Sequence, residues 1–234
     1  QYDLSDQLKD NAQVSIITIQ SEEGLEIMRH TLTAQVLARA IKNLYPKSKL
    51  AIGPTIEDGF YYDVESEEVI SSDDLIKIED EMKNIIKTKS LLTKKLVSKS
   101  EALKIFKEKK EPFKEIIINE SNQKNDFQLY YQDNEEFVDL CRGPHLPNLG
   151  FIGSFKLTKV SGAYWKGDSK NTMLTRIYGT AFNSDKDLQK HLNEVEEALK
   201  RDHRKLGREM DLFHFQDEAP GMVFWHPKGW TIYR

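Results

Sequence analysis

One stretch of the chain decides how we interpret it: Phe137-Val138-Asp139-Leu140-Cys141-Arg142-Gly143-Pro144-His145. Its first five residues alternate as in a strand, which the Gly143-Pro144 pair must end. Cys141 is the only cysteine in 234 residues, and His145 follows four positions later. A thiol at the end of a strand and an imidazole just past the turn can point into one pocket. The same spacing also fits a buried free cysteine beside a turn histidine, so the pair alone does not establish a site.

The composition is that of a globular protein with a substantial core, because 38% of the residues are hydrophobic and 31% are charged. A net charge of -4 excludes a uniformly basic nucleic-acid binder but allows a local basic groove. A single cysteine excludes an intrachain disulfide and indicates a reducing, cytoplasmic setting. No apolar run approaches the ~18 residues that a membrane span needs, so we expect no contact with a membrane.

The chain begins without Met, and its last residues, 230–234, read as a strand that has no partner. We therefore expect a piece of a longer protein. Elsewhere, apolar residues at helical spacing predict a long helix from Glu22 that Pro46 ends. Further helices are predicted near residues 73–89, 100–107, 112–117 and 184–210. Strands are predicted at residues 14–19, 58–64, 92–97, 127–131, 137–141, 155–160, 163–165, 173–180, 211–215 and 221–225.

Helices and antiparallel-looking strands interleave without a regular βαβ rhythm, which predicts the α+β class, with an antiparallel sheet packed against long helices. The sequence contains neither a glycine-rich phosphate loop nor a nucleophilic-serine elbow. The polar residues that could share one pocket are instead Asp139, Cys141, His145, His30 and Lys114.

Two interpretations of this polar set remain open from the residues alone. A four-ligand zinc site would need two ligands one turn apart on the long helix, and neither His30 with Ala34 nor position 31 with Gln35 supplies two. Alternatively, the pocket positions a water molecule for hydrolysis. In that case His145 or Lys114 orients or deprotonates the water, while the neighbouring thiol and carboxylate contact a small polar substrate.

Seven short motifs are spread along residues 22–234: 51–54 (AIGP), 59–63 (GFYYD), 141–145 (CRGPH), 162–165 (GAYW), 176–181 (RIYGTA), 201–207 (RDHRKLG) and 218–226 (EAPGMVFWH). In this order they closely resemble the threonyl-tRNA synthetase family. The resemblance implies four parts along the chain. These are the tail of a small β-rich N-terminal domain (1–21), an editing domain shared with alanyl-tRNA synthetase (22–182), a linker helix (183–210) and the first strands of a class II catalytic core (211–234).

The resemblance also implies a two-site enzyme. The class II core, mostly absent here, charges threonine tRNA with the help of ATP, Mg and Zn, so this piece itself is expected to need no cofactor. The editing domain hydrolyses mischarged seryl-tRNA. Serine lacks only the methyl group of threonine, and such a difference gives a single pocket only about 1–3 kcal/mol of discrimination. The expected partners are the acceptor end of threonine tRNA and mischarged serine, within a cytoplasmic enzyme that is a homodimer at full length.

The family's editing pocket combines a His-x-x-x-His pair on the long helix with Cys-x-x-x-His, a lysine, an aspartate and a tyrosine. Carried over by motif, the resemblance implies catalytic roles for His145, Lys114 and His30. It implies substrate contacts for Cys141, Asp139, Tyr62 and Gln35, and no metal.

The helical pair departs from the family pattern, because one extra residue follows His30 and the second histidine has become Gln35. On a regular helix these two residues lie about 140° apart. Either the helix begins just after His30 or a one-residue π-bulge lies between the two, and we expect the bulge. An alternative function also follows: a module that binds the tRNA acceptor end, in which the change to Gln35 has weakened editing.

Overall fold

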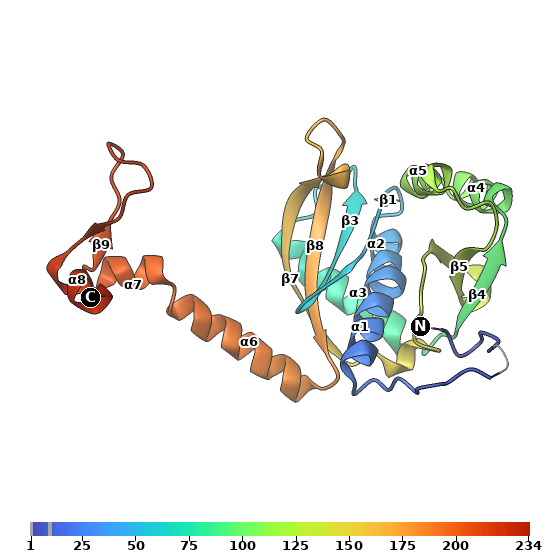
Figure 1. The fold of residues 1–234 in the computed structure, drawn as a ribbon. Coiled ribbons are helices and arrows are strands. Elements are labelled where there is room, and N and C mark those ends of the chain that lie inside the picture. The colour runs from blue at the N-terminus through green and yellow to red at the C-terminus, as the bar shows by residue number, and fades with distance from the viewer. Residues whose placement is uncertain (1, 9–10) are drawn as a thin grey trace. The chain divides into compact units, whose positions relative to one another are not determined.

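The computed structural model describes residues 2–8 and 11–234. Contacts divide the chain into two compact units, Gln1–Leu188 and Gln189–Arg234, which are treated separately below. The first unit combines helices with two antiparallel sheets, and the second unit holds a short antiparallel hairpin with helices (Figure 1). The predicted mixture of helices and antiparallel sheet is therefore confirmed.

The larger sheet of the first unit has the strand order β1-β3-β8-β7, with β2 paired to β3, and every pairing is antiparallel. Its strands are β1 (Lys49–Leu50), β2 (Thr55–Ile56), β3 (Gly59–Glu65), β7 (Ser154–Tyr164) and β8 (Met173–Phe182). Two strands predicted separately, at 155–160 and 163–165, form the single strand β7. They join because residues 160–164 keep pairing with β8 without interruption.

The long helix that packs against this sheet consists of α1 (Glu22–Thr31), the π-helical segment η1 (Leu32–Leu37) and α2 (Ala38–Leu44). Ser21 caps its start by accepting a hydrogen bond from the backbone N–H of Gly24. The π-helical segment confirms the bulge expected from the sequence. Helix α3 (Leu75–Lys87) follows the 3₁₀ turn η2 (Ser72–Asp74), where Ser71 and Asp74 form a capping box.

The main hydrophobic core lies between these helices and the larger sheet. Its fully buried side chains include Met28, Leu32, Ile41, Phe60 and Ile177. Burial of one such large apolar side chain contributes about 1.5–3 kcal/mol, so this core fixes the position of the long helix.

A second layer is built on the antiparallel sheet β4-β5-β6. Its elements are β4 (Leu92–Val97), α4 (Lys99–Glu108), α5 (Pro112–Glu120), β5 (Phe127–Gln132) and β6 (Phe137–Leu140). Ser98 caps α4, and Pro112 occupies the first turn of α5. A smaller core, formed by residues such as Phe106, Ile118 and Leu129, holds the two helices against this sheet. Short 3₁₀ turns complete the unit: η3 (Asp133–Glu135), η4 (Leu149–Phe151) and η5 (Trp165–Gly167).

Two sequence predictions near the ends of the chain are wrong, and a third is confirmed in part. The segment 14–19 forms no strand, and its apolar side chains are exposed because no neighbouring strand pairs with them. The predicted helix 184–210 is divided into α6 (Asp185–Lys200) and α7 (His203–Glu209), because Asp202 starts a new helix by capping it. Residues 230–234 fall largely in α8 (Pro227–Tyr233), which Pro227 opens, and not in a strand.

The second unit also contains the hairpin of β9 (Phe213–His214) and β10 (Phe224–Trp225). The assignment of 211–234 to a class II core remains a prediction, as do the other proposed domain boundaries. The prediction for 1–21 falls partly on residues 1, 9 and 10, which lie outside the described residues. Within the described part of the chain, no helix has the length and apolar character needed to cross a membrane.

Candidate functional site

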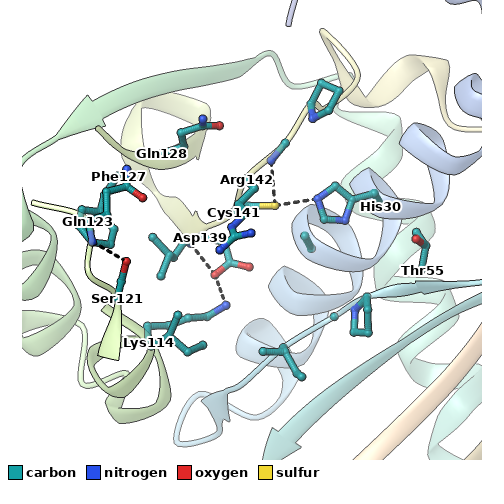
Figure 2. A pocket seen from close by; sticks show the side chains of 18 of the residues that line it. His30, Thr55, Lys114, Ser121, Gln123, Phe127, Gln128, Asp139, Cys141 and Arg142 are labelled. Carbon is teal, nitrogen blue, oxygen red and sulfur yellow. Dashed lines mark hydrogen bonds and ion pairs between the residues drawn. The ribbon is translucent and has the colours of Figure 1, made fainter. Parts of the chain in front are cut away.

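A cavity of about 1020 Å³ is lined by both layers of the first unit. The long helix contributes His30 and Ala34 to its wall, and α5 contributes Lys114. Strand β6 and the loop that follows it contribute Asp139 and Cys141. In Figure 2, His30 and Cys141 face each other on one side of the cavity, while Lys114 reaches Asp139 on another.

The contact between the long helix and the β6 loop is a hydrogen bond between His30 and Cys141. Its two atoms, Nε2 of the imidazole and Sγ of the thiol, lie 2.8 Å apart. The sulfur also accepts a longer hydrogen bond, of 3.5 Å, from the backbone N–H of Gly143. This glycine has a positive φ of 62°, and a side chain there would collide with the hydroxyl of Tyr130. The Cys-x-x-x-His motif therefore owes its tight turn to a glycine.

The proton of His145 is placed by Thr31. The threonine hydroxyl donates its only proton to the carbonyl oxygen of Ile27, at 2.8 Å. It must therefore accept from Nδ1 of His145, at 3.1 Å, and from the backbone N–H of Leu146, at 3.0 Å. His145 thus carries its proton on Nδ1, which leaves a lone pair on Nε2. That buried Nε2 atom has no hydrogen-bond partner among the described residues.

The ring of His145 contacts two other rings. It stacks on His30 with 4.7 Å between centroids and an angle of 4° between planes, and it meets Tyr130 at an angle of 79° with 4.3 Å between centroids. The Tyr130 hydroxyl donates to Asp3 at 2.6 Å, and Asp3 also accepts from the backbone N–H of His145 at 3.0 Å. The two histidines of the site are therefore held face to face.

A buried cluster of Lys114, Asp139 and Tyr62 lies beside this pair. Nζ of Lys114 forms an ion pair with Oδ1 of Asp139 at 2.6 Å. The Tyr62 hydroxyl lies 3.3 Å from Nζ and 3.4 Å from Oδ2 of the aspartate. All three residues are buried. A buried ion pair needs further hydrogen bonds to offset its desolvation, and Tyr62 and the backbone N–H of Leu140 supply them.

Gln35 does not reach the cavity. It is fully buried, and its amide pairs with Gln132 on β5, whereas Ala34 faces the cavity in its place. Like His145 and Tyr62, Gln35 is not among the residues that line the cavity, and its contact with a substrate remains a prediction. The inserted residue turned Gln35 into the core while the π-helical segment kept His30 beside Cys141.

Burial keeps the two histidines and the thiol of the site uncharged. It lowers the pKa of His30 and lowers the pKa of His145 well below its usual value. Burial also raises the pKa of the Cys141 thiol to about 12. For Asp139, burial raises the pKa of the carboxyl while Lys114 opposes that shift. The two imidazoles are therefore uncharged at neutral pH, and the thiol is protonated.

Comparison with known proteins assigns the family. Residues 128–178 match the domain described as "Threonyl and Alanyl tRNA synthetase second additional domain". The chain is 50% identical over 232 residues to a threonine–tRNA ligase of Prochlorococcus marinus (strain MIT 9211), covering 99% of this chain and 36% of that protein. It is 51% identical over 233 residues to the ligase of strain MIT 9515, again covering 36% of the relative. The chain belongs to the threonyl-tRNA synthetase family. It spans about a third of the length of these relatives.

In this synthetase chain, one group of residues has the composition of a metal site. The ligand atoms of His30, Cys141 and His145 all lie within 4.8 Å of one another, in the described part of the chain. Two such donors bound to one tetrahedral zinc ion, at about 2.3 and 2.0 Å, would lie about 3.5 Å apart. The 2.8 Å between the sulfur and Nε2 of His30 is shorter and fits a direct hydrogen bond. As placed, this pair of atoms forms a hydrogen bond, and the expectation of no metal remains a prediction.

The sequence analysis did not identify three residues of the site: Thr31, Tyr130 and Asp3. Thr31 directly follows His30, but no pattern distinguishes it from any other helical threonine. Tyr130 pairs with Asp139 across β5 and β6, and this register cannot be read from either strand alone. Asp3 lies 142 positions from the residue that it contacts. Only Tyr130 could have been suspected from the sequence, because it lies on β5, the strand that precedes β6 and its Cys-x-x-x-His motif.

Proposed function

We propose that this chain is the editing part of a threonyl-tRNA synthetase and hydrolyses the ester bond of seryl-tRNA. The observation that carries the proposal is the lone pair on Nε2 of His145. It is neutral, buried and unpartnered among the described residues, and it lies beside the cavity-lining residue His30. Such an atom can take a proton from water. His145 itself is not among the residues that line the cavity, so the access of water to this atom is part of the proposal.

The need for such a site follows from the chemistry of the two amino acids. A pocket that binds threonine also accepts serine, which is smaller by one methyl group, and loses only about 1–3 kcal/mol. A second site that hydrolyses the smaller product removes the error. The cavity, at about 1020 Å³, has the volume to enclose a terminal nucleoside with its esterified amino acid.

In the proposed reaction, a water molecule attacks the carbonyl carbon of the ester and gives its proton to Nε2 of His145. The negative charge that develops on the carbonyl oxygen is stabilised by the cationic Lys114, which is held in place by Asp139 and Tyr62. The carbon–oxygen bond to the ribose then breaks, and His145 returns the proton to the departing ribose hydroxyl. The products are serine and uncharged tRNA.

Cys141 is proposed to shape the pocket so that it admits serine and excludes threonine. With a pKa of about 12, roughly one thiol in 10⁴ to 10⁵ is ionised at neutral pH. A pathway through the thiolate therefore starts from a very small population, whereas the water pathway uses a base that is ready at neutral pH. The thiol is better suited to hold the ring of His30.

Within the longer protein, we propose that the remaining class II core uses ATP, Mg and Zn to charge threonine tRNA. The proposed enzyme is a cytoplasmic homodimer, and this chain contacts the acceptor end of the tRNA. The support for these proposals is the identity of about 50% with curated threonine–tRNA ligases.

The experiment that tests the proposal is deacylation of serine-charged threonine tRNA by this chain. We expect turnover well above the spontaneous rate, and loss of turnover when His145 is changed to Ala. Threonine-charged tRNA is the matched control and should survive. A substrate that decays no faster than in buffer would reject the hydrolase.

A second candidate is a module that binds the acceptor end without efficient hydrolysis. It is favoured by one observation: Gln35 is turned into the core, so the long helix offers the cavity one histidine, not two. Filter binding distinguishes the candidates, because the module retains tRNA affinity while its deacylation rate stays at the spontaneous level.

A further inference from the structure

We propose that Gln132 is a positioning residue that stabilises the π-helical segment η1 and thereby keeps His30 against Cys141. Gln132 ends strand β5 and is 1% exposed. The effect of Gln132 on turnover rests on the proposed hydrolysis, whereas its effect on the position of His30 does not.

The side chain of Gln132 binds the main chain of the π-helical segment directly. Its Nε2 atom donates to the backbone carbonyl of Gln35 at 2.6 Å and to the side-chain oxygen of Gln35 at 2.9 Å. A π-turn departs from the regular i→i−4 ladder, so a carbonyl within it gains from a donor outside the helix. Gln132 supplies that donor from a neighbouring strand.

The orientation of His30 relative to α2 depends on η1, because η1 joins α1, anchored in the main core by Met28, to α2. Downstream, Ala38, Ala40 and Ile41 are fully buried and fix α2 in the main core. Return of the extra residue to regular α-helical geometry would rotate the upstream turn by about 100° relative to α2. His30 would then leave Cys141, from which it is separated by only 2.8 Å.

Gln132 also connects the helix to the hairpin that carries the other half of the site. Its Oε1 atom accepts from Arg39 at 3.1 Å, and Arg39 pairs with Asp133 and Glu136 in the turn between β5 and β6. Strand β6 leads directly to Cys141. One amide thus sets the long helix relative to the hairpin, at the end of the hairpin opposite to the cavity.

The side chain of Gln35 supports the same interpretation. Its Nε2 atom is buried and has no hydrogen-bond partner among the described residues. The N–H groups of this amide therefore do not hold Gln35 in place. The side-chain oxygen of Gln35 accepts a hydrogen bond from Gln132. Both N–H groups of the Gln132 amide therefore bind Gln35, one at its backbone carbonyl and one at its side chain. The pair fixes the segment at a single point.

The test compares Gln132→Met with Arg39→Met in this chain. The first variant keeps the volume but removes the donor to Gln35, and the second removes the outer contacts while leaving that donor in place. Two measurements are made: kcat and KM for deacylation of serine-charged tRNA, and the ¹⁵N and ¹H NMR signals of the His30 imidazole. The second measurement reports the contact with Cys141 without any substrate.

For Gln132→Met we expect kcat to fall on the order of ten- to a hundredfold with KM unchanged, as for a misplaced catalytic group. The His30 signals should move to those of a ring that has lost its partner. Arg39→Met should keep both kcat and the His30 signals. If Gln132→Met does not fold, Gln132→Glu retains the contact with Arg39, cannot donate to Gln35, and should give the same result.

The proposal is overturned if the donor-less variants keep the wild-type His30 signals, or if Arg39→Met shifts them equally. Absence of deacylation in the wild type would reject the proposed function alone, since the NMR comparison still decides the role of Gln132.

Discussion

A single hydroxyl group decides which nitrogen of His145 is free to act as a base. Thr31 donates to Ile27 and so can only accept from His145. Without that hydroxyl, either nitrogen of the ring could carry the proton. The protonation state of the site therefore depends on a threonine that itself has no reactive chemistry.

We expect Thr31→Val to lower kcat for deacylation on the order of tenfold or more, because the base loses its fixed tautomer and orientation. The variant also leaves the buried N–H of Leu146 unpaired, which costs about 1–3 kcal/mol of unfolding free energy. Urea denaturation and deacylation assays measure the two effects. Thr33→Val is the control: Thr33 is equally buried and donates to Tyr61, so it should lower stability without lowering kcat.

The lowered pKa values of His30 and His145 predict the pH dependence. Both rings are neutral above their usual pKa of about 6.5, so deacylation should be level from about pH 7 upward and fall only below pH 6.5. The unfolded chain binds these protons at higher pH than the folded chain. Stability is therefore fully present above about pH 6.5 and is lost as the pH falls toward the lowered values. A rate that rises tenfold per pH unit between 7 and 9 would contradict a histidine base.

Cys141 should react slowly with alkylating reagents. Its thiol, with a pKa of about 12, is ionised roughly a thousandfold less at pH 8 than a free cysteine. Because it is the only cysteine, the mass gained with iodoacetamide reports this residue alone. We expect the folded chain to be modified far more slowly than the urea-unfolded chain, and equal rates would show that the thiol is not held protonated.

Among the elements, the helices and strands of the first unit were largely predictable, because their caps and periodicity are local. Ser98, Pro112 and the Ser71–Asp74 box each mark a helix start within four residues of sequence. The π-helical segment was predictable only from the resemblance, since one extra residue has no local signature. The prediction of a strand at 14–19 was wrong because a segment with alternating apolar residues forms a strand only when a partner strand pairs with it.

The described N-terminal segment should contribute to the site. Asp3 bonds both the backbone of His145 and the Tyr130 hydroxyl, and it pairs with Lys94 at 3.0 Å. We expect Asp3→Ala to lower kcat several-fold and to reduce stability by about 1–3 kcal/mol, because two buried donors lose their acceptor. Asp73→Ala, at an exposed position in η2, is the control. An unchanged kcat in Asp3→Ala would show that this segment does not contribute to the site.

At the scale of the molecule, every residue assigned to the site belongs to the first unit. We expect a chain that ends at Leu188 to fold and to keep kcat for deacylation, with circular dichroism and single-turnover assays as the measurements. His145→Ala in the short chain is the control. A rise in KM alone would show that later residues help to bind tRNA, whereas loss of kcat would contradict the assignment.

Part of the composition of the site could be predicted from the sequence, but its assembly could not. His30, Cys141 and Lys114 were identified by motif, and the structure brings them to one cavity. Their distances depend on how two separate layers pack, and no local pattern encodes that contact. The same reason explains Gln35: its direction is set by the packing of the long helix against β5.

The two layers differ in the size of their hydrophobic cores, and the site needs both. His30 stands on the helix of the larger core, whereas Lys114 and Cys141 belong to elements around the smaller one. Elements held by fewer buried apolar contacts open at lower free energy than the rest of a protein. Heating should therefore separate the two halves of the site before the molecule unfolds. In a synthetase that edits as proposed, accuracy in protein synthesis would be lost at a lower temperature than the fold itself.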